Sequence, residues 1–277
     1  MLFAFRKNGS VESLQCLALE TYDFIRHAFC TRRTGVSKVP FLSLNAGDHL
    51  GDREEDVLKN RAMIADAFHL DSRNLIIVDQ VHGDGILVLG DPADSTGKYA
   101  SAACDAIVTD RPGLALAVKT ADCVPIFLVD PVRRIVGAVH AGWRGTTLKI
   151  AAKTVDVFIK RFAGRPGDIL AVIGPAIGPC CYEVDEQVHE AMMYDKNRDR
   201  LFRPLPDAGK WMFDLPLANK LHILNRGVPE ENIFLADCCT ACRKDMFFSH
   251  RAEGGKTGRQ LNFIYIKNSC NKNYLTR

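Results

Sequence analysis

The stretch Thr120-Ala-Asp-Cys-Val-Pro-Ile-Phe-Leu-Val-Asp-Pro-Val-Arg-Arg-Ile-Val-Gly-Ala-Val-His-Ala-Gly-Trp-Arg-Gly-Thr146 is the most informative part of this 277-residue chain. It holds two apolar runs on either side of residues 130–133, where a proline suits the second position of a turn. The two runs predict antiparallel strands joined as a hairpin. A two-residue turn would pair positions whose numbers sum to 263, and Cys123 would then lie directly opposite His140.

Such a pairing would bring a thiol and an imidazole onto one face of a sheet. Cβ atoms of directly opposed residues lie about 4.5–5.5 Å apart. A thiolate and an imidazole at that spacing can reach one ion, at about 2.3 and 2.0 Å respectively. Because Pro-Val is not a favoured two-residue hairpin turn, the register could also slip by one residue, which would place the two side chains on opposite faces.

His82 is the third candidate ligand. It ends the strand-like run 76–82 and is followed at once by Gly83, so we expect it at the rim of a sheet, where sites commonly lie. His82, Cys123 and His140 would form a two-His, one-Cys set with an open fourth position, which is typical of catalytic zinc. Since ligands so far apart in sequence have no local signature, the alternative is a packed thiol near two hydrogen-bonded histidines.

Apolar runs elsewhere predict further strands, and amphipathic segments predict the helices between them. The expected strands are 2–5, 75–78, 86–89, 106–108, 114–118, 124–129, 135–140, 169–173, 233–235 and 261–266. The expected helices are 53–68, 146–162, 186–193 and 214–225. The absence of strict strand–helix alternation argues against a Rossmann-type fold. The sequence predicts one α+β domain over residues 1–277, with a mixed, layered β-sheet core flanked by helices.

The composition narrows the class of protein. Hydrophobic residues make up 47% of the chain, which excludes a disordered protein. The net charge of +3 argues against a nucleic-acid or membrane-surface partner. The longest uncharged stretch, 169–182, is well short of the roughly 20 residues that span a bilayer, and Arg6 and Lys7 interrupt any signal-peptide core. We therefore expect a cytoplasmic protein, either a monomer or a homodimer.

The ten cysteines need their own explanation. In a large chain that is not exported, most thiols are expected to be buried packing groups. Cys238, Cys239 and Cys242 include a C-x-x-C pair, but Cys180 and Cys181 are adjacent and offer no second pair of that spacing. The pattern predicts a packed thiol cluster rather than structural zinc. The alternative is a redox or thiol-sensing binding protein that uses Cys238, Cys239 and Cys242.

Three arginines are candidates for binding an anion. Arg144 lies between the strand of His140 and the next helix, whose first N–H groups would favour an anion; the alternative is a tight turn with Thr146 as helix cap. Arg61 lies on the apolar side of its helix and either extends to solvent or faces a pocket. Arg259 lies in a glycine-rich loop that could equally be solvated. Together, Arg61, Arg144 and Arg259 predict a site for a phosphate-sized anion.

Two carboxylates are candidates for proton transfer. Glu183 ends the rigid loop 174–183 and is the better placed of the two, although it could instead cap the following helix. Asp122 directly precedes Cys123. We expect one of the two carboxylates, that of Glu183 or that of Asp122, to carry a proton during catalysis.

Several motifs together resemble one protein family. They are Asn45-Ala-Gly-Asp-His-Leu-Gly-Asp52, Lys59-Asn-Arg61, Asp79-Gln-Val-His-Gly83, Thr120-Ala-Asp-Cys123, Val139-His-Ala-Gly-Trp-Arg-Gly145, Ile173-Gly-Pro-Ala-Ile-Gly-Pro-Cys-Cys-Tyr-Glu-Val184, Phe247-Phe-Ser-His-Arg251 and Thr257-Gly-Arg259. In this order, and over nearly the whole chain, they resemble the bacterial multicopper polyphenol oxidase (laccase-like) family, now described as purine nucleoside phosphorylases. Ser249-His-Arg-Ala replaces the family's usual Ser-Tyr-Arg-Arg, so one cation is missing.

The resemblance implies a zinc ion held by His82, Cys123 and His140, with copper possible in its place. It implies purine nucleosides (adenosine, inosine, guanosine and methylthioadenosine) and phosphate as substrates, with adenosine deaminase and methylthioadenosine phosphorylase as side activities. In deamination, the open zinc position would activate water for attack on C6 of adenine. In phosphorolysis, the three arginines would hold phosphate.

Two other enzyme classes compete with this hypothesis. A related family member is linked to correcting peptidoglycan precursors, which suggests a hydrolase with Cys123 as nucleophile and His140 as base. A true laccase builds a trinuclear copper cluster largely from H-x-H pairs, and none of the eight histidines lies two residues from another. The sequence therefore argues against laccase chemistry.

Overall fold

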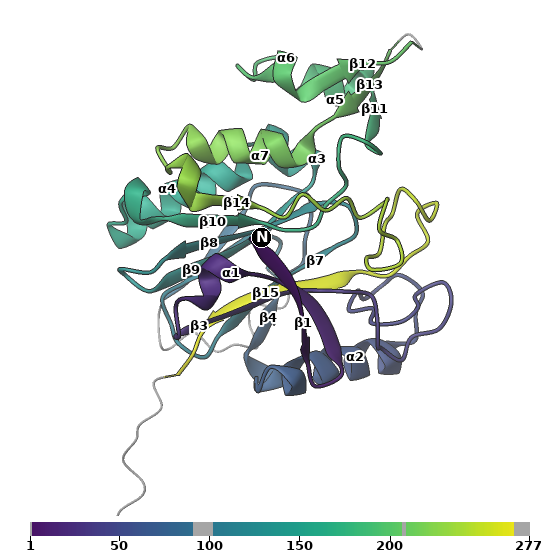
Figure 1. Ribbon diagram of the computed structural model, residues 1–277, viewed down its shortest axis with the longest axis vertical. Helices are drawn as coiled ribbons and strands as arrows, with labels where there is room; N and C mark the ends of the chain where they lie inside the picture. The colour runs from purple at the N-terminus through teal and green to yellow at the C-terminus, as the bar shows by residue number, and fades with distance from the viewer. Residues whose placement is uncertain (1, 91–101, 207–208, 269–277) are drawn as a thin grey trace, which may run out of the picture.

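Two six-stranded sheets stacked face to face form the centre of the molecule (Figure 1). The computed structural model describes residues 2–90, 102–206 and 209–268. In spatial order the first sheet consists of β1 (Phe3–Asn8), β2 (Val11–Cys16), β3 (Ile25–Cys30), β15 (Gln260–Ile266), β7 (Ala115–Thr120) and β4 (Leu75–Ile77). The second consists of β14 (Ile233–Leu235), β10 (Leu170–Ile173), β8 (Val124–Asp130), β9 (Ile135–Ala141), β6 (Ala106–Thr109) and β5 (Ile86–Leu89). Both sheets mix parallel and antiparallel pairs.

Apolar side chains fill the space between the sheets, and helices cover their outer faces. Between the sheets, Phe29 stacks on Phe127 with ring centroids 4.5 Å apart. On the outer face of the first sheet, Ile64 of α2 (Glu54–Ala67) packs in a cluster with Phe263 of β15. On the outer face of the second sheet, α4 (Ile150–Phe162) and α7 (Leu215–Leu224) enclose the largest apolar cluster. The order of layers is therefore helix, sheet, sheet, helix (Figure 1).

A smaller unit extends beyond α7 at the top of Figure 1. It contains a three-stranded antiparallel sheet and two short helices. They are β11 (Glu183–Asp185), β13 (Lys210–Phe213), β12 (Phe202–Pro204), α5 (Glu186–Ala191) and α6 (Arg198–Leu201). Among the described residues, the remaining short elements are α1 (Leu17–Glu20), α3 (Trp143–Thr147), and the 3₁₀ turns Ser72–Asn74, Pro166–Asp168 and Glu230–Asn232. Within the described residues, no helix is long and apolar enough to cross a membrane.

The predicted α+β class with a mixed, layered sheet core is confirmed. All ten expected strands overlap a strand of the structure, but β2, β3 and the strands of the small sheet were not predicted. β3 is buried along most of its length yet contains Arg26 and His27, so it does not appear as an apolar run. The His27 imidazole is buried and its Nε2 accepts a hydrogen bond from the backbone N–H of Cys16 (2.8 Å). Burial lowers the pKa of His27 to about 3, so the ring remains a neutral acceptor.

The hairpin of β8 and β9 forms as predicted, but with a different register. Pro125 pairs with His140, so paired positions sum to 265 and the turn has four residues rather than two. The Asp130 carboxylate accepts hydrogen bonds from the N–H groups of Val132 and Arg133 and thereby stabilises the longer turn. The predicted pairing of Cys123 with His140 was therefore wrong by two positions. Because side chains alternate with period two, both still point to the same face.

The predicted helix over residues 146–162 is divided in two. A short helix, α3, begins at Trp143, and Lys149 then adopts a left-handed conformation (φ 61°) before α4 begins at Ile150. Thr146 is thus a buried residue inside α3 rather than a helix cap, and its hydroxyl accepts a hydrogen bond from Asn219 (2.9 Å). Trp143 and Arg144, the first residues of α3, directly follow Gly142 at the end of β9.

Candidate metal centre and its cavity

Cys123 lies where the chain crosses from one sheet to the other. β7 of the first sheet ends at Thr120, and β8 of the second begins at Val124. Asp122 makes the crossing possible with a left-handed backbone (φ 87°). Its carboxylate is held by the Thr240 hydroxyl (2.6 Å) and by the backbone N–H of Arg251 (2.7 Å). The position of Cys123 is therefore determined by the edge that joins the two layers.

His140 is positioned by a buried carboxylate that the sequence analysis missed. The Asp105 side chain is fully buried, and its Oδ1 lies 2.7 Å from Nδ1 of His140. This contact leaves Nε2 of His140 for another partner. A carboxylate on the second nitrogen is the usual orienting group of a metal-binding histidine. The only signal in the sequence was an aspartate directly before the apolar run of β6, which has no specific meaning by itself.

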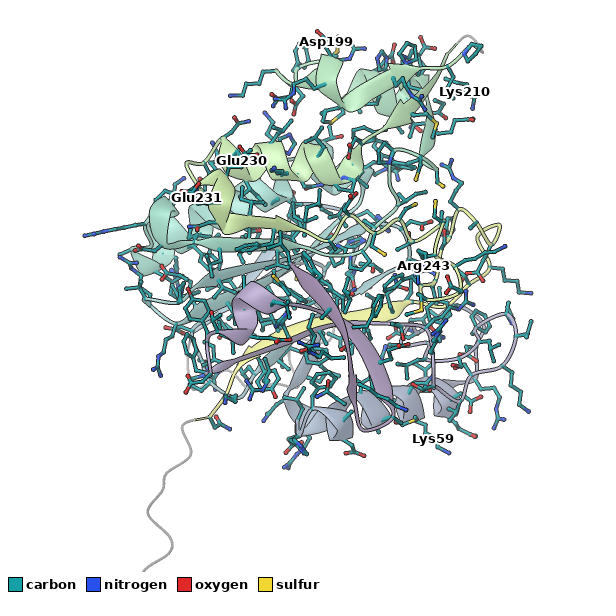
Figure 2. The ribbon with its side chains drawn as sticks, in the orientation of Figure 1. Lys59, Asp199, Lys210, Glu230, Glu231 and Arg243 are labelled. Carbon is teal, nitrogen blue, oxygen red and sulfur yellow. The ribbon has the colours of Figure 1, made fainter. Side chains whose placement is uncertain are left out.

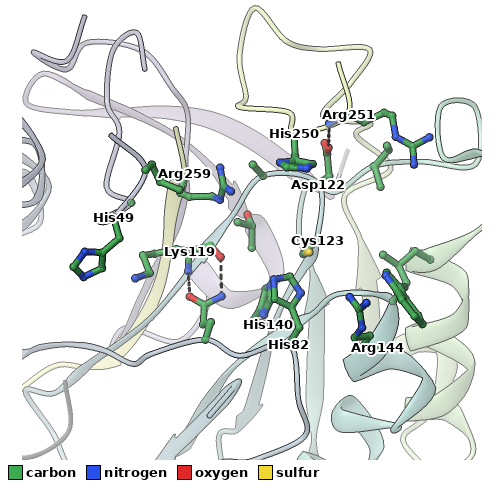
Figure 3. Close-up of a pocket in the computed structure, with 18 of the residues that line it drawn as sticks. His49, His82, Lys119, Asp122, Cys123, His140, Arg144, His250, Arg251 and Arg259 are labelled. Atoms are coloured by element: carbon green, nitrogen blue, oxygen red, sulfur yellow. Dashed lines mark hydrogen bonds between the residues drawn. The ribbon is translucent and has the colours of Figure 1, made fainter. Parts of the chain in front are cut away.

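The same carboxylate holds the loop that carries His82. Asp105 accepts hydrogen bonds from the backbone N–H groups of His82 (3.0 Å) and Gly83 (2.6 Å). His82 has a left-handed backbone (φ 58°), which is uncommon for a residue other than glycine. The His82 and His140 rings meet edge to face, with centroids 4.8 Å apart (Figure 3). Asp105 thus organises both histidines at once.

The structure brings the three predicted ligands together. One ligand atom each from His82, Cys123 and His140 lies within 4.8 Å of the others. Gly142 is required for this approach, because a Cβ at this position would lie 2.8 Å from Nδ1 of His82 and 3.1 Å from the Cys123 sulfur. One thiolate and two imidazoles are ligands that zinc accepts, and such sets leave a fourth position for substrate or water. The donor set and its spacing therefore fit a zinc ion.

The charged groups around Cys123 favour the ionised thiolate, which is the form of cysteine that binds a metal. Burial opposes ionisation of Cys123, but the neighbouring His140 and His82 rings lower the pKa of its thiol to about 6. Burial likewise disfavours a charged His140, but Cys123 and Asp105 raise its pKa to about 9. The Asp105 carboxyl is buried, and yet the hydrogen bonds from His140 and from the loop N–H groups lower its pKa. The sulfur is consequently a thiolate at neutral pH, which is the form that binds metals.

All three ligands line a cavity of about 560 Å³, within the range of small-molecule sites. Residues from eight separate segments of the chain form its walls. Those labelled in Figure 3 are His49, His82, Lys119, Asp122, Cys123, His140, Arg144, His250, Arg251 and Arg259. Trp143, Tyr182 and Ile177 add apolar surface. The cavity thus combines the candidate metal ligands with several cationic groups and two aromatic rings.

Three guanidinium groups around the cavity have no carboxylate partner in the described part of the chain: those of Arg144, Arg251 and Arg259. Arg144 lies over the Trp143 ring, 4.3 Å from its centroid, and Arg251 lies over the Tyr182 ring at 5.4 Å. Arg259 is half-buried and is held only by carbonyl oxygens. Unpaired cations gathered in a cavity favour binding of an anion. Arg144 and Arg259 were predicted from the sequence as anion-binding residues, but Arg251 was not.

The remaining predicted residues lie at different distances from this cavity. Asp122 lines it. Arg61 lies behind the wall, where it donates to the carbonyl of Ala46 and pairs with Asp48 (3.0 Å). The Glu183 carboxylate lies in an adjoining pocket, 3.6 Å from Nζ of Lys210, which Figure 2 labels on the small sheet. The structure therefore does not bring Arg61 or Glu183 into the main cavity.

The fold and the cavity define a layered α+β protein with a candidate His–His–Cys metal centre. The chain belongs to the multi-copper polyphenol oxidoreductase laccase family, whose model matches residues 26–267. It is 40% identical over 242 residues to purine nucleoside phosphorylase YlmD of Geobacillus stearothermophilus, covering 84% of this chain and 87% of that protein. It is 38% identical over 238 residues to purine nucleoside phosphorylase YfiH of Escherichia coli, covering 85% and 91%.

Solved structures show the same architecture. The hypothetical protein YfiH of Bacillus licheniformis superimposes with a TM-score of 0.88 at 39% identity, over 95% of this chain and 99% of that one. YlmD from Geobacillus stearothermophilus superimposes with a TM-score of 0.85 at 37% identity, again over 95% and 99%. The resemblance expected from the sequence motifs is thereby confirmed.

Proposed function

We propose that this chain is a zinc-dependent purine nucleoside phosphorylase, with adenosine deaminase and methylthioadenosine phosphorylase as side activities. The observation that carries the proposal is one cavity with a His–His–Cys set and three unpaired guanidinium groups. The names of the relatives at about 40% identity support the same reaction. We assign the metal site to zinc held by His82, Cys123 and His140; when bound, the ion supplies a Lewis acid with one open position.

The guanidinium groups would hold phosphate in the cavity. Arg144, Arg251 and Arg259 come from three separate segments, so phosphate would contact cations on more than one side. Arginine is suited to this task because its planar fork binds two phosphate oxygens at once. Phosphate held in this way would attack C1′ of the ribose as the bond from C1′ to the purine nitrogen breaks. Ribose 1-phosphate and a free purine would result.

Aromatic side chains would receive the purine. Trp143 and Tyr182 both line the cavity, and each already carries an arginine over its ring. A purine has a flat aromatic surface and gains about 0.5–1.5 kcal/mol beyond burial from a well-placed aromatic pair. This arrangement would hold base and phosphate near one another. Such positioning is a large part of catalysis when two substrates must meet.

The leaving purine nitrogen needs a proton, and Asp122 is the better placed of the two predicted carriers. Each Asp122 oxygen accepts one hydrogen bond, from Thr240 or from Arg251, which fixes the carboxylate at the cavity wall. The Glu183 carboxylate faces Lys210 in the adjoining pocket and would require a movement of the small sheet. We therefore propose Asp122 as the proton carrier and Glu183 as the second choice.

The test is incubation of the purified protein with adenosine, with and without phosphate, followed by chromatography. We expect adenine and ribose 1-phosphate only when phosphate is present, and inosine in its absence as a product of deamination. Methylthioadenosine should yield free adenine with phosphate. A His82→Ala variant should lose both reactions if they share the metal centre. Absence of ribose 1-phosphate and inosine from every reaction would overturn the proposal.

One observation favours a second candidate, the Cys–His hydrolase acting on peptidoglycan precursors. The lowered pKa of Cys123 and the raised pKa of His140 would create a thiolate–imidazolium pair in metal-free protein, as cysteine hydrolases require. Metal analysis separates the two functions. One tightly bound ion per chain that shields Cys123 from alkylation would contradict the hydrolase. A reactive Cys123 in fully active protein would contradict the zinc enzyme.

A further inference from the structure

Four cysteines from two loops gather in a second cluster. Cys180 and Cys181 follow β10, and Cys239 and Cys242 follow β14. All four sulfur atoms lie within 4.8 Å of one another. The Cys242 sulfur is 3.5 Å from that of Cys180 and 3.4 Å from that of Cys181. Cys180 and Cys181 therefore add two thiols to the C-x-x-C pair Cys239 and Cys242. From the sequence we did not expect this, because Cys180 and Cys181 are adjacent rather than spaced as C-x-x-C.

Backbone pairing between the two loops brings these thiols together. β10 and β14 are parallel neighbours, and their pairing continues past their ends as a bridge between Ala176 and Cys239. There the N–H of Thr240 donates to the carbonyl of Ala176 (3.0 Å). The N–H of Gly178 donates to the Cys239 sulfur (3.3 Å). The cluster is thus preorganised by the sheet, as a binding site must be.

Packing alone does not explain the cluster. Cys180 and Cys242 are exposed, and Cys181 and Cys239 are only half-buried. Arg243, which directly follows Cys242, lies at the surface of the molecule in Figure 2. Thiols that serve as small apolar groups are normally buried. Four thiols in contact at the surface therefore do not fit the packed cluster that the sequence predicted.

The sulfur spacing matches a tetrahedral metal site. Zinc–sulfur bonds of about 2.3 Å in a tetrahedron separate the sulfur atoms by roughly 3.8 Å. The spacing in this cluster, from 3.4 Å up to 4.8 Å, brackets that value. A disulfide would need sulfur atoms about 2.05 Å apart. A set of four thiolates selects zinc among the common divalent ions of proteins.

We propose that Cys180, Cys181, Cys239 and Cys242 bind a second zinc ion in a closed, four-thiolate structural site. This site would fasten the two loops to each other. Both loops also hold Asp122: the N–H of Ile177 donates to its carbonyl oxygen (2.9 Å), and the Thr240 hydroxyl donates to its carboxylate. Asp122 directly precedes Cys123, so the second ion stabilises the wall that carries the first.

Zinc content of the purified protein tests this proposal independently of activity. We expect two zinc ions per chain in the wild type and one in the double variant Cys180→Ser, Cys242→Ser. Cys238→Ser is the matched control, because Cys238 lies in the same loop but outside the cluster, and it should retain two ions. Cys123→Ser should retain one. A zinc content of the double variant equal to that of the wild type would overturn the proposal, whatever the occupancy of the His82, Cys123 and His140 site.

Alkylation of the wild-type chain gives a second measurement that does not depend on a variant folding. A phosphine reductant keeps any disulfide open, so protection that ends when a chelator removes the metal reports metal binding. We expect Cys180 and Cys242 to resist iodoacetamide until a strong zinc chelator is added, and to react at once afterwards. Rapid reaction before chelation would refute the site. Failure of phosphorylase activity with both thiols still protected would leave this site intact and refute only the proposed function.

Discussion

Replacement of Asp105 by asparagine tests whether the missed carboxylate organises the metal centre. Its Oδ1 faces Nδ1 of His140 and the N–H of His82, and its Oδ2 faces the N–H of Gly83. All of these partners donate when Nε2 of His140 is the ligand. An asparagine amide has only one acceptor oxygen, so in either orientation its NH₂ group would face a donor. Asp105→Asn therefore breaks the arrangement without changing the size of the side chain.

The expected loss can be estimated from this geometry. Removal of the partner of a metal-binding histidine lowers metal affinity by about 10–100-fold, which corresponds to about 1.4–2.8 kcal/mol. Because Asp105 is fully buried, a donor left unpaired there would also lower the free energy of unfolding by about 1–3 kcal/mol. Weaker zinc binding and lower stability are thus both expected, and a control must separate them.

Asp130→Asn is the matched control. Asp130 is equally buried, accepts backbone hydrogen bonds in the β8–β9 turn and lies at the opposite end of the same strands from Cys123 and His140. We expect its replacement to lower stability but to leave zinc affinity unchanged. Zinc affinity would be measured by competition with a chromophoric chelator, and stability by urea unfolding of metal-free protein. A zinc affinity of Asp105→Asn within twofold of wild type would refute the reasoning.

Three further predictions follow from the same site. Gly142→Ala should weaken zinc binding or folding by about 1–3 kcal/mol, because the new Cβ would lie 2.8 Å from Nδ1 of His82. Gly167→Ala is the control: a Cβ there would meet open space, so zinc content should not change. In metal-free protein, alkylation of Cys123 should rise with pH around a midpoint of about 6, because its pKa is lowered; a midpoint near that of an ordinary thiol, about 8.5, would contradict this. Arg259→Ala should raise the phosphate KM by about tenfold or more, while Arg61→Ala, behind the cavity wall, should change it less; equal KM values would argue against a cation site in the cavity.

The sequence predicted the layered architecture because most strands in such a fold are buried on both faces. β8 and β9 are buried along their whole length and appear as uninterrupted apolar runs. β3 was not predicted because it contains the polar residue His27. The buried His27 ring accepts a hydrogen bond from a backbone N–H of the neighbouring strand, and no local sequence pattern reveals that partner. The small sheet was not predicted because its strands are short and mostly exposed or half-buried, so they form no continuous buried apolar run.

The proximity of Cys123 and His140 could be predicted even though the predicted register of the β8–β9 hairpin was wrong. The turn after Asp130 has four residues, so Cys123 and His140 are diagonal rather than directly opposed. A register shift of two residues keeps both side chains on one face of the sheet, whereas a shift of one residue would have placed them on opposite faces. Asp105 and the thiol pair after β10 were not predictable, because their partners come from distant segments. Only the parallel pairing of β10 with β14 brings the four thiols together.

The family is described as a polyphenol oxidoreductase, whereas its relatives are named purine nucleoside phosphorylases. The His82, Cys123 and His140 side chains help to decide between these two activities. A His–His–Cys set also occurs in blue-copper sites, which add a weak axial ligand such as methionine and serve electron transfer. Among the described residues that line this cavity there is no methionine, and the ligands open onto about 560 Å³ surrounded by cations. Electron transfer requires neither such a volume nor three unpaired guanidinium groups, whereas the volume suits a nucleoside and the guanidinium groups suit phosphate. The surroundings of the ligands, more than the ligands themselves, therefore favour phosphorolysis over polyphenol oxidation.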